Sequence, residues 1–525
     1  MIKTLSAWPV LLLLAVGILL FRTPFSASDL SITPDSVEYS AGALSLATKG
    51  TYEITIQDQA YPPRYPPWFS LIFLTPAYCI TGTEPGNAVF PILLFSLLGV
   101  LAAWRIGYTF SGPWGAFCAA AGLLLVPSFR IYSREIMSDI PCTALVLLLA
   151  LIYLRLRSEP ARSASLFWAA GLLTALCAAI RPTSLGVAIP FVILALRPVS
   201  FPKLIAAVSP LLVIGSLTLW YNQSTFGSFR NGYQYWCPVP CDYINLTFSL
   251  AYIRHNVPVM LSSGILLWGS LIVLLWLFFR NRTTDPVAGP RPSRAMAEFT
   301  VATGVPLLAF HAIYFFPEER FYLPLLALLG TWAGALLGHC FARIPVSRVI
   351  GAQIVILAMA GLVRQLNAEP PPFRRMGIEA IRQKTPANAV IISALDPVYL
   401  DIMLGASGRK FIPLSRRVEY ASKLVAPFRI SHPNPPPVFW GDHRSRGMRA
   451  GGAREVIAST ASESPSEIAQ WLQQGVPVFL DTCYLTEVDE MILAKLKKEF
   501  DFKPKGESLG ELTLPNARPS ASAGD

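Results

Sequence analysis

The segment AGLLLVPSFRIYSREIMSDIPCTALVLLLALIYL, residues 121–154, decides the fold, because it places a short charged stretch between two strongly apolar runs. The charges are Arg134, Glu135 and Asp139, within SREIMSDIP at 133–141. Charged side chains at the edge of hydrocarbon are costly to desolvate, so they either face water or serve a function. The segment predicts two membrane helices joined by a turn with unusual chemistry.

The whole chain has the composition of an integral membrane protein. Of its 525 residues, 53% are hydrophobic and only 14% are charged, and the mean hydropathy is +0.48. These values are too apolar for a soluble domain. A bilayer requires about 20 residues per helix. We therefore expect about eleven transmembrane helices, at 6–22, 87–106, 113–131, 141–156, 164–180, 184–199, 203–221, 257–279, 297–316, 321–342 and 347–364.

Lys and Arg in the short loops predict the orientation. They place the N-terminus with Lys3 in the cytoplasm. The outer face then receives 23–86, 133–141, 222–256, 317–320 and everything after 364. The net charge of +11 is explained by cytoplasmic loops, so no nucleic acid partner is expected. The compact, arginine-rich loops favour a bacterial inner membrane. Alternatively, residues 1–28 with SAS at 26–28 are a cleaved secretory signal, which leaves the remaining topology unchanged.

The composition changes near residue 365 to a normal charge density. Helical and strand-like patterns alternate beyond it, which predicts a small α/β domain on the outer face. We expect three parts: a transmembrane catalytic domain at 1–364 with the first outer loop at 23–86, an extracytoplasmic domain at 365–515, and a disordered tail at 516–525. Cys237 and Cys241 in CPVPC would be able to close a disulfide on an oxidising outer face; the sequence leaves this open.

Several motifs occur along the chain: Asp35 followed by Tyr39, Gly-x-Tyr at 50–52, YPPRYPPWFSLIF from 61, SREIMSDIP, AAIRPTSLG at 178–186 and ERFYLPLLALLG at 319–330. Together they resemble the GT-C membrane glycosyltransferases, especially the branch of protein O-mannosyltransferases, bacterial aminoarabinose transferases and related lipopolysaccharide sugar transferases. The resemblance covers about 365 residues. One departure is that Asp35 has no acid beside it, unlike the paired Asp-Glu of the protein mannosyltransferases, which favours bacterial relatives with lipid or polysaccharide acceptors.

The resemblance implies an enzyme that takes a sugar from a polyprenyl phosphate on the outer leaflet and transfers it to a lipid, glycan or protein acceptor. It also implies that an acid in the first outer loop, here Asp35, is the base. The chemistry agrees, since a partly buried carboxylate can accept the proton of an attacking hydroxyl. Glu38 is the second candidate for the base. The alternative is that Asp35 only caps the helix that follows it.

Glu135 and Asp139 are four residues apart, so on a helical turn they would share a face and point into the same outer cavity as Asp35. We expect both to act in catalysis by orienting acceptor or sugar hydroxyls, with Arg134 balancing their charge. The alternative is that Arg134 pairs with Asp139 or with headgroups, and that Asp139 caps the next helix.

The leaving lipid phosphate requires cations. Arg320 is the first candidate to hold it, against a plain headgroup anchor, and Arg181 and Arg64 are second choices. Tyr39 and Tyr65 are further candidates for substrate binding. We interpret His255 and His311 as structural. No metal or other cofactor is expected, although Asp35 with the two acids of the turn would be able to hold a divalent ion.

Direct displacement with Asp35 as base would invert the anomeric carbon. A transporter or flippase for a lipid-linked or anionic substrate is the alternative function. Transporters tend to place ionisable groups near the bilayer midplane, often in repeated halves. Here the unusual charges gather in outer loops.

Overall fold

The computed structural model describes residues 34–56, 59–158, 164–197, 199–229, 231–232, 247–280, 291–314, 318–343, 372–404, 408–414, 447–450, 453–456, 460–461, 465–483, 485 and 487–515. The chain divides into two compact units. Unit 1 comprises Met1–Pro24, Val89–Phe229 and Ile244–Ala368, and unit 2 comprises Phe25–Ala88, Arg230–Tyr243 and Glu369–Asp525. The predicted spans 6–22 and 347–364, and the cysteines 237 and 241, lie outside the described residues.

Unit 1 is helical. Six described helices are long and apolar enough to cross a membrane, and three further apolar helices are shorter. The chain is therefore a membrane protein. Its main elements are α4 (Val89–Leu124), α5 (Pro127–Tyr132), α6 (Asp139–Ser158), α7 (Ala164–Ile180), η4 (Pro182–Ala188), α8 (Ile189–Ala195), α9 (Phe201–Phe226), η6 (Leu250–Tyr252), α12 (Ile253–Met260), η7 (Leu261–Ile265), α13 (Leu266–Arg280), α14 (Arg291–Ala312), η8 (Glu319–Tyr322) and α15 (Leu323–Arg343).

The described helices follow the apolar runs, but the predicted number of eleven is not reached among the described residues. The expected spans 87–106 and 113–131 lie largely on α4, which is broken at Ser111 and Gly112. Gly112 has φ 62°, in the region that favours glycine, so the two legs turn back here. A Cβ on Gly107 would overlap the carbonyl of Gly115. The legs therefore form a hairpin whose close approach depends on glycine.

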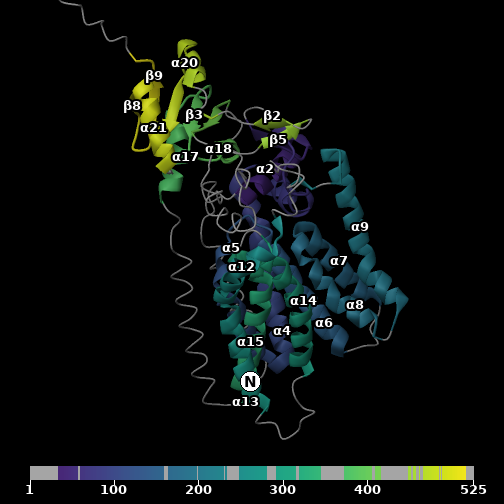
Figure 1. The fold of residues 1–525 in the computed structure, drawn as a ribbon. Coiled ribbons are helices and arrows are strands. Elements are labelled where there is room, and N and C mark those ends of the chain that lie inside the picture. The colour runs from purple at the N-terminus through teal and green to yellow at the C-terminus, as the bar shows by residue number, and fades with distance from the viewer. Residues whose placement is uncertain are drawn as a thin grey trace, which may run out of the picture. The chain divides into compact units, whose positions relative to one another are not determined.

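Helices α4 and α15 run side by side (Figure 1). Gly330, Gly334 and Gly338 recur every four residues along α15. A Cβ on Gly334 would overlap the carbonyl of Cys118, and one on Gly338 would lie 2.5 Å from the carbonyl oxygen of Trp114. Small residues allow this backbone approach, which substitutes for the missing hydrophobic driving force between helices in lipid.

Unit 2 gathers the first long loop with the C-terminal segment. The loop contains α2 (Pro34–Lys49), β1 (Ile54–Ile56), β2 (Gln59–Tyr61), η2 (Ser70–Leu74), α3 (Thr75–Thr81) and η3 (Pro85–Ala88). The C-terminal segment contains α17 (Pro372–Lys384), β3 (Val390–Ser393), α18 (Pro397–Leu404), β4 (Lys410–Pro413), β5 (Gly447–Ala450), β6 (Ala453–Val456), α20 (Pro465–Gln473), β7 (Val478–Asp481), α21 (Glu487–Glu499), β8 (Asp501–Pro504) and β9 (Leu509–Thr513).

The C-terminal segment folds around a five-stranded sheet of order β4-β3-β7-β9-β8. Strands β4, β3 and β7 are parallel, whereas β9 is antiparallel to both β7 and β8. The central strands β3 and β7 are buried at every residue, as is typical of a parallel sheet. Helix α18, which follows β3, packs against α2 and β1 of the first loop.

Asp481 ends β7 and is fully buried. Ser393 Oγ donates to its Oδ2 at 2.8 Å, and the Cys483 N–H donates to its Oδ1 at 3.1 Å. Burial nevertheless raises the pKa of Asp481 to about 6 from 3.8. Between about pH 3.8 and pH 6, Asp481 is therefore protonated to a greater extent in the folded chain than in the unfolded chain.

We expect the sheet to lose stability as pH rises. The contribution of protonated Asp481 is fully present below pH 3.8 and is lost as pH rises through about 6, a change of at most about 3 kcal/mol. Hydrogen exchange of β3 and β7 in the full chain, corrected for intrinsic rates, measures it. Asp481→Asn should remove most of the pH dependence. An unchanged pH profile in that variant would contradict the assignment.

Candidate functional site

The first group of candidate residues lies in unit 2, on and beside α2. Asp35 lies in the first turn of α2, which begins at Pro34, so it follows the start of the helix rather than preceding it. A carboxylate at this position interacts favourably with the helix dipole. Glu38 lies three residues further along the same helix. The loop that follows β2 brings Arg64 to both of them.

Arg64 joins the two acids. Its Nη2 donates to Asp35 Oδ1 at 3.3 Å, and its Nε donates to Glu38 Oε1 at 3.0 Å. The Arg64 backbone N–H also donates to Glu38 Oε2 at 3.1 Å. Gly232 packs directly against the Arg64 backbone, and a Cβ at position 232 would overlap the Arg64 carbonyl. One buried guanidinium therefore fixes the direction of both carboxylates.

The two acids differ in access. The Asp35 side chain is 21% exposed, whereas that of Glu38 is 0% exposed. An acceptor hydroxyl is therefore able to reach Asp35 but not Glu38 in this arrangement. This difference favours Asp35 over Glu38 as the base.

Aromatic rings form one side of this group. The Tyr39 and Tyr65 ring centroids are 4.4 Å apart, and Tyr39 meets Phe69 edge-on at 4.7 Å. Arg64 Cζ lies 5.3 Å from the Tyr65 ring centroid. The Tyr-Pro dipeptides at 61 and 65 did not predict these ring contacts. All five candidate residues predicted in the first loop nevertheless lie in this group.

The second group lies in unit 1, where the SREIMSDIP turn meets η8. The turn is not helical between Ser133 and Ser138, and α6 begins at Asp139. The expectation that Glu135 and Asp139 share a helical face is therefore wrong. Asp139 is 2% exposed and pairs with Arg181, rather than with Arg134 as the alternative reading proposed.

Arg320 also has an acidic partner. Its Nε lies 2.6 Å from Glu318 Oε2, and its Nη1 lies 3.6 Å from Met137 Sδ of the turn. Tyr132 donates to Glu318 Oε1 at 3.4 Å. Burial, with Glu318 nearby, raises the pKa of Tyr132, so the phenol is neutral and acts as a donor.

The two arginines share one aromatic ring. Arg181 Cζ and Arg320 Cζ each lie 5.2 Å from the Phe321 ring centroid. Two cations and two carboxylates, Asp139 and Glu318, thus gather around Phe321 with little net charge. A guanidinium carries five N–H donors. Ion pairing therefore does not exhaust what Arg181 offers to an anion.

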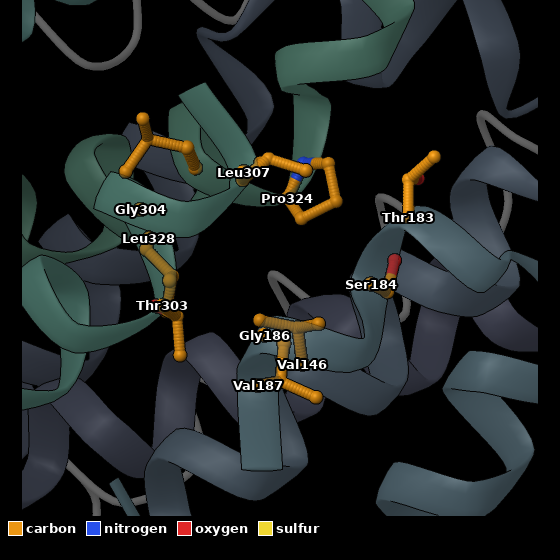
Figure 2. A pocket seen from close by; sticks show the side chains of 11 residues that line it. Val146, Thr183, Ser184, Gly186, Val187, Thr303, Gly304, Leu307, Pro324 and Leu328 are labelled. Atoms are coloured by element: carbon orange, nitrogen blue, oxygen red, sulfur yellow. The ribbon is translucent and has the colours of Figure 1, made fainter. Parts of the chain in front are cut away.

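An apolar pocket lies along the same elements (Figure 2). Its lining comes from α6, η4, α14 and α15, and it is mostly apolar, with threonine and serine hydroxyls at η4 and α14. The lining residues nearest in sequence to Arg181 are Thr183 and Ser184, and the one nearest to Arg320 is Pro324. Arg181 directly precedes η4, and Arg320 lies on η8, which directly precedes α15, so the arginines and the pocket lining come from adjoining segments of the chain.

The candidate site residues divide between the units. Asp35, Glu38, Tyr39, Arg64 and Tyr65 belong to unit 2. Arg134, Glu135, Asp139, Arg181 and Arg320 belong to unit 1. Within the described residues, no group of three or more His, Cys, Asp or Glu side chains is placed to hold a metal ion.

No family model matches the sequence, and no curated protein does. Solved structures share the fold. The aminoarabinose transferase ArnT of Cupriavidus metallidurans matches with a TM-score of 0.60 both in the apo state, at 14% identity, and bound to undecaprenyl phosphate, at 13%. Each match covers 97% of this chain and 98% of that chain.

The Archaeoglobus fulgidus oligosaccharyltransferase, in complex with Zn and sulfate, matches with a TM-score of 0.50 at 11% identity, over 96% of this chain and 73% of that one. Both neighbours are GT-C superfamily proteins. At these identities the similarity shows the fold. The resemblance indicated by the motifs is thus confirmed at that level: the chain has a GT-C-type fold.

Proposed function

We propose that the protein is a glycosyltransferase that moves a sugar from a polyprenyl-phosphate donor to a lipid, glycan or protein acceptor on the outer face of the membrane. The observation that carries the proposal is the arginine group around Phe321, on segments that adjoin the apolar lining of η4 and α15. A lipid phosphate has the matching chemistry, an anionic headgroup on an apolar chain. The ArnT neighbour bound to undecaprenyl phosphate supports this choice.

The donor is a phosphodiester that joins the sugar to the lipid. As the acceptor oxygen bonds to the anomeric carbon, the bond from that carbon to the phosphate oxygen breaks, and polyprenyl phosphate leaves. Asp35 takes the acceptor proton, which a positioned carboxylate does well. The configuration inverts because attack occurs opposite the phosphate.

The other candidate residues of each unit also have proposed roles. Arg64 and Glu38 orient the Asp35 carboxylate, and the rings of Tyr39 and Tyr65 form a surface that contacts the substrate. Arg64 also supplies, between the two acids, the positive charge that a divalent ion would bring. In unit 1, Arg181 and Arg320 hold the phosphate, Asp139 positions Arg181, and Glu135 and Arg134 orient sugar or acceptor hydroxyls.

The orientation is also part of the proposal. The protein spans a bacterial inner membrane, with its N-terminus in the cytoplasm and its C-terminal α/β segment on the outer face. We also propose that the transmembrane domain ends near residue 364 and that the outer domain ends near residue 515.

The test of the proposed function is a donor panel. Membranes containing the wild-type protein are given radiolabelled sugars on polyprenyl phosphate, with nucleotide sugars and free sugars as controls. We expect transfer from at least one polyprenyl-phosphate donor and none from the controls. Transfer from a nucleotide sugar would contradict the proposal. So would the absence of transfer from every polyprenyl-phosphate donor in the panel.

A further inference from the structure

His311 lies near the end of α14. A purely structural role does not explain the environment of its imidazole ring. Its side chain is 2% exposed. Its ring stacks on Phe321, with centroids 4.8 Å apart and planes 8° apart, and meets Tyr322 edge-on at 5.8 Å. Neither ring nitrogen has a hydrogen-bond partner among the residues that the structure describes.

Two further buried polar atoms nearby lack partners in the same described part of the chain. They are Arg181 Nε and the Tyr322 hydroxyl. Arg181 and His311 both contact the Phe321 ring. We call His311, Arg181, Phe321 and Tyr322 the His311 cluster. Buried polar groups in native proteins are almost always hydrogen-bonded, so such a concentration of unused donors points to a ligand or water that completes them.

The cluster continues the elements that line the apolar pocket. Thr303 and Leu307 line the pocket on α14, and His311 follows them at the same four-residue spacing, which is one face of a helix. Thr183 comes two residues after Arg181, and Pro324 comes two residues after Tyr322. The cluster residues are therefore two to four residues in sequence from residues that line the apolar pocket.

The backbone at His311 is held independently of any ligand. Asn256 Nδ2 donates to the His311 carbonyl at 2.9 Å, to the Ala312 carbonyl at 3.1 Å and to the Tyr314 carbonyl at 2.5 Å. The first two bonds satisfy carbonyls in the last turn of α14 that the helix itself leaves unused, and the third fixes the chain just after it. The imidazole is thus presented from a fixed backbone.

We propose that His311 and Tyr322 are binding residues for the phosphate of the polyprenyl carrier, to which each donates a hydrogen bond beside Arg181. The inference rests on the proposed function, because it names which groups of that site recognise the donor. An imidazole carries at least one N–H, and hydrogen bonds to an ionised phosphate are among the stronger ones. The shared chemistry of the candidate ligands is an anionic phosphate group, a diester in the sugar donor and a monoester in the released carrier and in phosphatidic acid.

Three substitutions separate the hydrogen bond from packing. His311→Phe keeps a ring that can stack on Phe321 and removes both nitrogens, whereas His311→Gln restores an N–H donor. Tyr322→Phe removes only the hydroxyl. Binding of radiolabelled polyprenyl monophosphate to the full-length protein in lipid nanodiscs is measured for each, with thermal unfolding as the control for folding.

We expect His311→Phe to weaken binding of polyprenyl phosphate about tenfold or more, Tyr322→Phe about fivefold, and His311→Gln less than about threefold. Competition with phosphatidic acid and with inorganic phosphate identifies the source of the phosphate. Unchanged binding in His311→Phe, or in Tyr322→Phe should His311→Phe not fold, would overturn the inference. Equal competition by either comparator would overturn the assignment to the polyprenyl carrier.

Sugar transfer separates this inference from the proposed function. If the wild type transfers sugar and His311→Phe has an unchanged KM for the donor, the inference fails and the proposed function stands. If polyprenyl phosphate binding depends on His311 but the wild type transfers no sugar, the inference stands and the proposed function fails.

Discussion

Asp35→Asn is expected to lower the rate of sugar transfer by about 10²–10⁴-fold, because an amide cannot take the proton of the acceptor hydroxyl. Donor binding should survive, since the asparagine oxygen is still able to accept from Arg64 Nη2, which lies 3.3 Å from Asp35 Oδ1. Initial rates at matched protein levels, together with donor affinity, measure both quantities.

Glu53→Gln is the matched control for Asp35→Asn. It removes a carboxylate from the same loop, where Glu53 pairs with the exposed Lys49 at 3.1 Å. An exposed pair of this kind contributes little, so transfer should stay within about twofold of wild type. Near-normal transfer by Asp35→Asn would remove Asp35 from the role of base. The buried Glu38 would then be able to take that role only after rearrangement of Arg64.

Arg181→Leu is expected to destabilise the protein by about 3–5 kcal/mol, because it leaves Asp139 buried without its cation. Asp139 is 2% exposed, so water cannot replace the lost partner. The double variant Arg181→Leu with Asp139→Leu should regain most of the thermal stability. Its sugar transfer should remain at least about 10²-fold below wild type, as expected when a cation that stabilises the leaving phosphate is removed.

Arg294→Leu is the control for this pair of variants. Arg294 lies 3.2 Å from Glu298 and its side chain is 84% exposed, so its loss should cost less than about 1 kcal/mol. Full transfer by the stable double variant would show that Arg181 and Asp139 serve only the fold.

The membrane helices could be predicted well from sequence, because a run of apolar residues is a local property. The ends of α6 and α7 fall within two residues of the predicted spans 141–156 and 164–180. The break in α4 was also visible, as a gap between two predicted spans around Gly112. Strands β4, β8 and β9 were not predicted, because four or five residues with mixed polarity give no periodic signal.

The residues of the candidate site were predictable as types, but their pairing was not. Arg64 is 26 residues from Glu38, and Arg181 is 42 residues from Asp139. Such contacts are formed by tertiary packing, and no local pattern encodes them. The error at Glu135 has the same origin, since four-residue spacing implies a shared face only within a helix. The surroundings of His311 could not be predicted, because an apolar span looks identical whether its histidine is hydrogen-bonded or not.

The central claim is that the protein separates a sugar from a lipid phosphate rather than moving the intact lipid. Proteoliposomes containing the wild-type protein and a donor labelled with ¹⁴C in the sugar and ³²P in the phosphate test it most directly. The account predicts that the two labels separate, with one polyprenyl phosphate released for each sugar transferred, and that Asp35→Asn prevents the separation. Labels that stay together while the donor changes leaflet would contradict it.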